Sequence, residues 1–483
     1  MNLFLLSHEL CALLLGLLIL LVDLWLPPSE KRKLGYAAAA GIGVLLIYSL
    51  VQFSVGTIGT QYAFGGMYVL DPLALFFKRF FLVATLIVML MSVEFADRIE
   101  AGIAEYYALI LFAMTGMMFA ASANDFSTFF VSLELITVTF YVLTSFLRAR
   151  LPSLEAGIKY LIIGALSSAF MIFGIALVFG TSGTLSFDKL AATLPQFAQN
   201  KIFLFGLLLV LVGLGFKISM VPFQIWAPDV YQGAPSPTTA FLAVGSKAAG
   251  FVLLLRVLFS AVPEVTKHWV ALLMVLAGAT ILYGNLCAIP QRNVKRLLGY
   301  SSISHAGYLL LGISALSAAG QSAVLYYLSG YLFTVLAAFT VICLVMRQVE
   351  SADVAELAGL HQRSPLLAGT MTLAMVSLAG IPPLAGFFGK FLLLKSVVEA
   401  GARNSGYYCL AFVALAGVVI SLYYYFGIVR SIYWSKDAAD LSAIPVSPSI
   451  KLALFGCIAG MLFIGIYPNP LVNWAGEAVK VLR

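Results

Sequence analysis

Long apolar blocks separated by short polar breaks run along the whole of this 483-residue sequence. Hydrophobic residues make up 62% of the chain and charged residues only 10%, against roughly 25% charged in an ordinary soluble domain. A soluble globular enzyme of this composition would leave a large apolar surface in water, so that class is excluded. Because a transmembrane helix needs about 20 apolar residues, the sequence predicts a polytopic membrane protein.

The apolar blocks predict an all-α protein with about fourteen transmembrane helices. Helices are expected because each one satisfies its own backbone hydrogen bonds in lipid, and blocks of this length do not suit barrel strands. The predicted helix cores are 5–26, 35–55, 70–92, 104–122, 127–147, 158–180, 202–221, 238–260, 268–288, 297–317, 323–346, 366–395, 406–433 and 450–467. The stretches between them are of loop length, so we expect one integral membrane domain.

The distribution of lysine and arginine predicts the orientation. With an even number of spans, both termini lie on the same side of the membrane. The loops on the other side carry fourteen lysines and arginines, and the side of the termini carries seven, one of which is Arg256. Basic residues concentrate in cytoplasmic loops, so both termini are predicted to lie on the outer, periplasmic side. The first block precedes its basic cluster at 31–33 and is expected to be a retained span, not a cleaved signal. The net charge of +7 then marks topology, not nucleic-acid binding.

Lys217, Lys247 and Glu134 lie deep inside apolar blocks. A charged side chain at the centre of a span costs roughly 2.5–3.5 kcal/mol on insertion scales. One interpretation is an interhelical ion pair or a side chain that reaches to the interface. The other is a proton relay, because low dielectric disfavours the charged forms of both residue types and brings proton exchange within reach near neutral pH.

Other polar residues within the blocks allow both interpretations. Lys159 and Lys395 lie within a turn or two of a predicted helix end and could reach interfacial water. His305 lies among serines in GYSSISHAGYLLLGI and is either a satisfied core residue or a link between lysines through water. Lys78 and Arg79 are adjacent near the start of the third span, so at least one of them is expected at a wet or partner-covered surface.

Prolines interrupt two of the predicted spans. Pro222 and Pro228 lie in the seventh, and Pro382 and Pro383 lie in the twelfth, followed by Lys390. Proline disrupts a helix, and such a break survives in a membrane only inside protein or beside a cavity. Breaks at corresponding places indicate inverted repeats, although prolines that merely kink the helices are the alternative. The spacing predicts two five-helix repeats (spans 4–8 and 9–13). The expected divisions are 1–103 for the first three helices, 104–260 and 268–433 for the repeats, and 434–483 for the last helix.

The five cysteines are isolated from one another. No C-x-x-C occurs, and no group of cysteines and histidines has the spacing of a metal-binding motif. We therefore expect no iron–sulfur cluster, haem, zinc or other metal in this chain.

Three motifs resemble one family over nearly the whole chain. GLGFKISMVPFQIWAPDVYQGAPSPTTAFLAVGSKAAG, NVKRLLGYSSISHAGYLL and SLAGIPPLAGFFGKF are similar to subunit N of bacterial NADH-quinone oxidoreductase (complex I), an antiporter-like subunit related to mitochondrial NADH dehydrogenase subunit 2. The run VPFQIWAPDVYQGAP and the pair Ser246–Lys247 resemble subunit N and not its paralogues L and M. The resemblance implies fourteen helices, with helices seven and twelve broken, and one proton channel.

The resemblance also implies roles for residues of this chain. Glu134 and Lys217 correspond to the helix-five glutamate and helix-seven lysine that pair with each other. Lys247 corresponds to the central helix-eight lysine, and Lys390 to the helix-twelve lysine toward the exit. Two further residues match positions between these: Lys159 and His305. Lys395 matches no family position, and Gln224 stands where many relatives have histidine, so it is not expected to be an obligatory proton carrier.

The resemblance implies a proton-translocating subunit in the bacterial inner membrane with no redox centre of its own. NADH, FMN, iron–sulfur clusters and quinone are expected in partner subunits, and the neighbours are expected to be subunits L, M, K and J. One alternative is a cation/proton antiporter without a redox partner, against which the buried lysines argue because like charges repel. The other is a purely structural membrane scaffold.

Overall fold

The computed structural model describes residues 3–53, 59–349, 351–434 and 441–482. Lys436 and Arg483, both counted in the loop tally, lie outside these residues. The first half of the chain contains α1 (Ser7–Asp23), α2 (Lys33–Gln52), α3 (Pro72–Phe95), α4 (Ile103–Ala121), α5 (Phe126–Thr144), α6 (Leu151–Ser182), α7 (Phe187–Thr193), α8 (Lys201–Ile218), α9 (Ala227–Gly233), α10 (Ser236–Phe241) and α11 (Lys247–Leu255). The second half contains α12 (Pro263–His268), α13 (Val270–Ala288), α14 (Val294–Ser314), α15 (Ala318–Val345), α16 (Leu360–Arg363), α17 (Pro365–Ala379), α18 (Ala385–Gly401), α19 (Gly406–Trp434), α20 (Pro448–Ile466) and α21 (Asn469–Val479).

Shorter elements connect these helices. A two-stranded antiparallel hairpin, β1 (Gln61–Ala63) and β2 (Tyr68–Leu70), precedes α3. Six 3-10 turns are η1 (Leu3–Leu6), η2 (Pro28–Glu30), η3 (Phe64–Gly66), η4 (Ala96–Arg98), η5 (Leu194–Gln196) and η8 (Val354–Leu357). Two π-helical segments, η6 (Leu242–Ser246) and η7 (Arg256–Ala261), flank α11.

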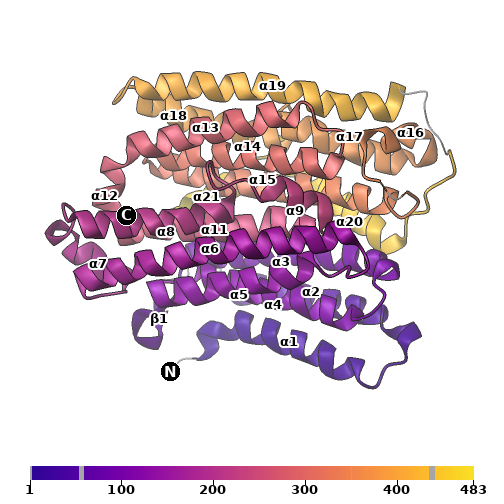
Figure 1. The fold of residues 1–483 in the computed structure, drawn as a ribbon, viewed down its shortest axis with the longest axis horizontal. Coiled ribbons are helices and arrows are strands. Elements are labelled where there is room, and N and C mark those ends of the chain that lie inside the picture. Colours follow the sequence, from indigo (N-terminus) through magenta and orange to yellow (C-terminus); the bar gives the residue numbers. More distant parts are fainter. Residues whose placement is uncertain (1–2, 54–58, 350, 435–440, 483) are drawn as a thin grey trace.

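The predicted number of spans is confirmed in the described residues. Twelve helical segments are long and apolar enough to cross a membrane. The more polar α14 and the interrupted pair α17–α18 add two passes to these twelve, which gives fourteen. The helices run side by side, and both chain ends lie at the same end of the bundle (Figure 1), as an even number of passes requires.

Both predicted helix breaks are present. In the seventh span, α8 ends at Ile218 and the helix resumes only at Ala227, with Pro222 between. In the twelfth span, α17 ends at Ala379 and α18 begins at Ala385. Proline cannot donate the backbone hydrogen bond of a continuing helix and clashes with the preceding turn, which explains why the chain unwinds at these two places.

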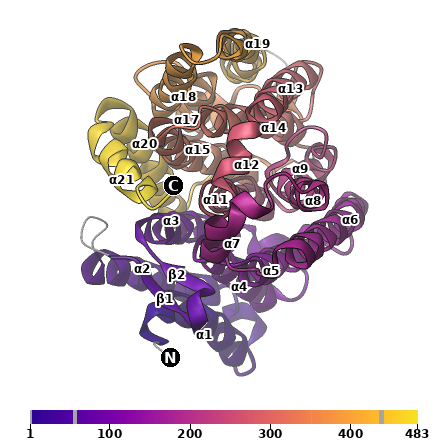
Figure 2. The same ribbon diagram turned by 90° about the vertical axis from the view of Figure 1, so that its left-hand side faces the viewer.

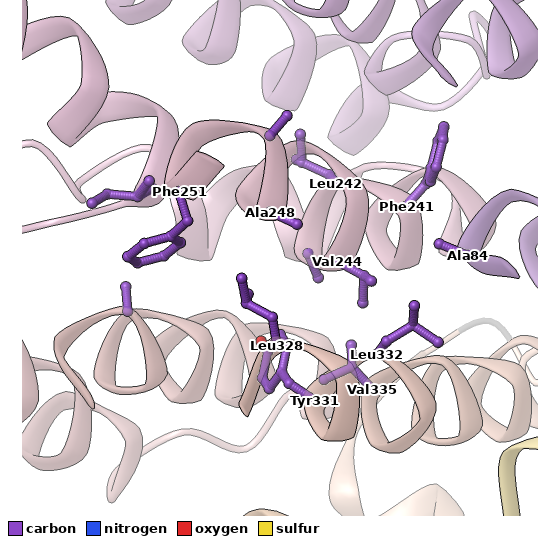
Figure 3. Packing of buried hydrophobic residues seen from close by; sticks show 14 of the residues in the cluster. Ala84, Phe241, Leu242, Val244, Ala248, Phe251, Leu328, Tyr331, Leu332 and Val335 are labelled. Carbon is purple, nitrogen blue, oxygen red and sulfur yellow. The ribbon is translucent and has the colours of Figure 1, made fainter. Parts of the chain in front are cut away.

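The eighth span lies at the centre of the molecule. Viewed along the bundle, α1 and α2 lie on one side and α19 and α13 on the other, with α11 and α15 between them (Figure 2). The segment Ser236–Ala261 is made of α10, η6, α11 and η7, and every residue of 236–259 is buried within the chain. Val244 and Ala248 lie on its side toward α15, where Leu328 and Leu332 are found (Figure 3). A span enclosed in this way can carry polar side chains without exposing them to lipid.

The loop tally misplaced Arg256. We predicted it in a loop on the terminus side, but it begins η7 inside the eighth span and is only 3% exposed. Asp71 accepts two hydrogen bonds from its guanidinium, of 2.9 and 3.0 Å. The sequence offered no sign of this partner, which lies 185 positions away.

Candidate functional site

Lys217 lies in the last turn of α8, immediately before the first helix break. Its side chain is buried, and its Nζ donates a 3.0 Å hydrogen bond to Thr137 Oγ1 on α5. Glu134 lies one turn before Thr137 on α5; it is half-buried, and its Oε1 accepts a hydrogen bond from Ser168 on α6. Glu134 and Lys217 form no ion pair in this structure, in which Ser168 and Thr137 bind the two groups, although the charge of Glu134 still acts on Lys217.

Lys247 lies at the centre of the buried eighth span, directly after η6. Its Nζ is 2.5 Å from the carbonyl oxygen and 2.5 Å from the hydroxyl oxygen of Ser302 on α14. The same hydroxyl also contacts Tyr231 and Tyr331, each through a 3.0 Å hydrogen bond. Single π-helical turns are frequent at functional sites, and here one ends next to the lysine.

His305 lies one turn after Ser302 on the buried face of α14. Its Nδ1 contacts the Tyr327 hydroxyl, and its Nε2 lies 2.9 Å from the Tyr425 hydroxyl. The imidazole is also close to Tyr331, with ring centroids 5.1 Å apart. Both ring nitrogens thus have hydroxyl partners, so the histidine is part of the polar row that begins at Lys247.

Lys390 lies in α18 beyond the second helix break, and its side chain turns back toward the end of α17. Its Nζ is 2.7 Å from the carbonyl oxygen of Leu378 and 3.3 Å from that of Ala379. The ammonium also lies 4.9 Å from the ring centroid of Tyr308, and the Tyr308 ring is 6.1 Å from that of His305. Lys390 therefore continues the same row of polar side chains.

Lys217 lies against α11, the helix that carries Lys247. A Cβ atom on Gly250 of α11 would lie 2.7 Å from Ile218 Cγ2 and 3.3 Å from Lys217 Cγ. Only glycine allows α8 and α11 to approach this closely. Gly250 is less than one helical turn from Lys247, so this contact brings the Lys217 side chain next to the start of the polar row.

The remaining candidates lie apart from this row. Lys159 is 41% exposed and forms ion pairs with Glu155 (2.6 Å) and Asp229 (2.7 Å). Lys395 is 57% exposed and lies 3.8 Å from Glu399. Gln224 is buried within the first helix break.

Sequence reasoning missed the residues that surround the lysines. Ser302 and the tyrosines come from α9, α14, α15 and α19, and no sequence spacing links these four helices to one another. Sequence reasoning also missed the partner of Lys78. The Lys78 side chain is completely buried, and its Nζ lies 2.8 Å from Glu9 Oε1. The neighbouring Arg79 is partly buried and donates a 2.7 Å hydrogen bond to the Ser49 carbonyl oxygen. The available signal for this pair was that Glu9 and Lys78 carry opposite charges in two different apolar blocks.

A bundle of fourteen passes with two interrupted helices and a row of buried lysines defines an antiporter-like membrane subunit. Comparison with known proteins gives the particular family. The family described as NADH:quinone oxidoreductase/Mrp antiporter matches residues 123–421. NADH-quinone oxidoreductase subunit N of Moorella thermoacetica is 40% identical over 98% of this chain and 98% of its own length. The corresponding protein of Heliobacterium modesticaldum is 40% identical over the full length of both chains. A chain of respiratory complex I from Thermus thermophilus is 31% identical, with a TM-score of 0.79 over 97% of this chain and 99% of that one. The chain belongs to the family of subunit N of NADH-quinone oxidoreductase.

Proposed function

We propose that this chain translocates protons as a membrane subunit of a proton-pumping NADH:quinone oxidoreductase. Lys217 and Lys247 act as proton carriers, and Lys390 acts as the carrier toward the exit. His305 connects Lys247 with Lys390 through its tyrosine partners, and Glu134 modulates the charge of Lys217. The reaction assigned to the chain is that of a translocase subunit.

One observation carries this assignment: the kind of partner that each buried lysine has. Lys217, Lys247 and Lys390 donate to hydroxyl and carbonyl oxygens, and none of them forms an ion pair with a carboxylate of the described residues. A carboxylate neighbour would hold an ammonium in its charged form. Neutral acceptors leave the proton free to move on through neighbouring hydroxyl groups, as a carrier in a relay requires.

The Glu134 carboxylate can supply the control. It lies one helical turn from Thr137, the partner of Lys217, and it is bonded to Ser168 on a different helix. If the carboxylate moves toward Lys217, it favours the charged lysine, and if it returns to Ser168, it favours release of the proton. Lys159 lies at the surface and contacts the broken seventh span through its ion pair with Asp229 on α9.

The redox chemistry is assigned to other subunits. NADH, FMN, iron–sulfur clusters and quinone would belong to the partners, and this chain would hold none of them. Its neighbours would be the membrane-arm subunits L, M, K and J. We place the chain in the bacterial inner membrane with both termini on the periplasmic side, and we assign its two five-helix repeats to 104–260 and 268–433.

The decisive experiment uses the assembled complex in sealed vesicles. Lys247→Met is compared with Lys395→Met, a matched control in which an exposed lysine is removed. Lys247→Met is expected to abolish proton uptake driven by NADH and to preserve NADH oxidation by an artificial acceptor. Normal pumping with normal assembly would favour a scaffold role. Cation exchange without a redox partner would favour the antiporter alternative.

A further inference from the structure

A second buried charged cluster lies away from the lysine row, where α1 and α3 meet. Glu9 is in the first turn of α1 and Lys78 is in the second turn of α3, and neither side chain has any exposed surface. Lys78 Nζ is 2.8 Å from Glu9 Oε1. Ionisable residues within membrane segments are rare and mark functional sites by default, and the lysine row does not use this pair.

Tyr68 on β2 holds both members of the pair. Its hydroxyl accepts a 2.6 Å hydrogen bond from Lys78 Nζ and lies 3.1 Å from Glu9 Oε1 and 2.9 Å from the Leu5 carbonyl oxygen. The ring of Tyr68 lies among buried apolar residues, which keep the dielectric around the pair low. The lysine and the carboxylate are therefore fixed at proton-transfer distance in surroundings that penalise their charged forms.

Polar atoms beside the pair lack partners. Glu9 Oε2 and both ring nitrogens of the adjacent His8 are buried and have no hydrogen-bond partner within the described chain. His8 lies against Tyr48 and Phe53, with ring centroids 5.6 and 5.3 Å apart. Most buried polar atoms in proteins are satisfied. A carboxylate oxygen and an imidazole that are not satisfied can accept or pass on a proton.

The same helix also connects the cluster to the eighth span. Asp71 is the N-cap of α3 and stands seven residues before Lys78, so the two lie on one face of the helix. The Asp71 carboxylate binds the buried Arg256, which begins η7 nine residues after Lys247. A fixed charge pair thus joins the start of α3 to the helix that carries the central lysine.

We propose that Glu9 and Lys78 form a second proton-transfer pair at the terminus side of the subunit, held in place by Tyr68. This inference rests on the proposed function, since it adds a site to the same proton-moving reaction. In the transfer step, an N–H bond of the Lys78 ammonium breaks and an O–H bond forms on Glu9 Oε1. A neutral amine and a neutral carboxylic acid result. The proton then moves to a ring nitrogen of the neutral His8, which has no hydrogen-bond partner in the described chain, and a further proton from water restores the Lys78 ammonium.

Few titratable or charged groups lie around this step. They are His8 and Glu9 from α1, Lys78 and Arg79 from α3, and the pair of Asp71 and Arg256. Arg79 is directed to the carbonyl oxygens of Ser49 and Phe53, so it stabilises the end of α2. Glu9 is the one carboxylate that binds Lys78 in the described chain.

The experiment compares Glu9→Gln, Lys78→Met and the double variant in the assembled complex. The controls are Glu399→Gln and Lys395→Met, which remove the exposed pair on α18. Each single variant is expected to lower coupled turnover by roughly 10²-fold, the contribution typical of a positioned proton-transfer group. NADH oxidation by an artificial acceptor is expected to stay normal.

The double variant separates proton transfer from a structural ion pair. Removing one partner of a buried pair leaves an uncompensated charge, whereas replacing both often restores stability. A structural role therefore predicts recovery in Glu9→Gln/Lys78→Met and in Lys78→Arg, and normal turnover in either variant overturns the proposal. Continued loss of turnover in both supports it.

A spectroscopic measurement keeps the proposal testable if a variant fails to assemble. Infrared difference spectra of the wild-type complex during NADH turnover are expected to contain a protonated-carboxyl band that Glu9→Gln removes and Glu399→Gln does not. Tyr68→Phe, which retains the ion pair, is expected to shift this band. No Glu9-dependent band would overturn the inference, and if Lys247→Met still abolished pumping, the proposed function itself would stand.

Discussion

Lys247 on α11 and Ser302 on α14 are joined twice, since the lysine Nζ lies 2.5 Å from both the carbonyl and the hydroxyl oxygen of the serine. The hydroxyl is shared with Tyr231 and Tyr331, so one small side chain connects the central lysine with two tyrosines. The carbonyl anchors the ammonium, and the hydroxyl provides its connection to the polar row.

Ser302→Ala tests this connection. The variant keeps the carbonyl acceptor but removes the link to the tyrosines, so we expect coupled NADH:quinone turnover to fall by roughly 10²-fold, the lower end of the range for lost proton-transfer groups. The measurement is turnover in sealed membranes, with artificial-acceptor activity as the measure of assembly. Ser396→Ala is the control, because that hydroxyl donates to the Leu393 carbonyl oxygen of its own helix. Equal turnover in the two variants would contradict the assigned path.

Glu134→Ala is expected to depress quinone reduction that is coupled to pumping. Without the carboxylate, nothing shifts the charge of Lys217 during the cycle, and NADH oxidation by an artificial acceptor should remain nearly intact. The two rates are measured in the same membranes, alongside Glu399→Ala as an exposed control. Normal coupled turnover in Glu134→Ala would remove this glutamate from the mechanism.

Lys217→Ala is expected to depress quinone reduction that is coupled to pumping, and Lys217→Arg tests whether the loss comes from proton transfer or from charge. Arginine keeps a positive charge near Thr137 but hardly deprotonates. If Lys217 carries protons, the arginine variant remains defective in pumping measured as protons taken up per NADH oxidised. Full recovery by arginine would mean that a fixed charge suffices at this position.

Gly250→Val tests the close approach of α8 and α11. The added side chain meets Ile218 and Lys217, and overpacking of this kind costs about 1–3 kcal/mol. We expect lower coupled turnover at a normal level of assembled complex, because the Lys217 side chain is displaced from its position against α11. Gly427→Val is the matched control, since a Cβ there meets nothing within 4 Å. Identical behaviour of the two variants would show that the contact has no part in proton transfer.

Much of the fold could be predicted because lipid imposes strong rules on sequence. Apolar block length indicated the passes, and the prolines at 222 and 382–383 indicated the two breaks, since both signals are local in the chain. The site was predictable only in part. Buried lysines stand out in an apolar block, but their acceptors do not, because serine and tyrosine are tolerated widely. Which hydroxyl faces Lys247, and that Thr137 binds Lys217, depends on how distant helices are rotated against each other. Arg256 was misplaced for the same reason: a charge near a block edge resembles a loop residue until its partner is known.

The contact of Lys390 with the last carbonyl oxygens of α17 gives the proton on this lysine a mechanical role. The carboxyl end of a helix carries a partial negative charge that a nearby cation stabilises, so the ammonium acts as a clamp between the two halves of the interrupted span. When the proton leaves, Lys390 becomes neutral and its attraction to the last carbonyl oxygens of α17 weakens, so α17 and α18 are held together less firmly. The protonation state of Lys390 Nζ would thereby determine how firmly α17 and α18 are joined, and transfer of its proton would allow the backbone to move at the break in the twelfth span.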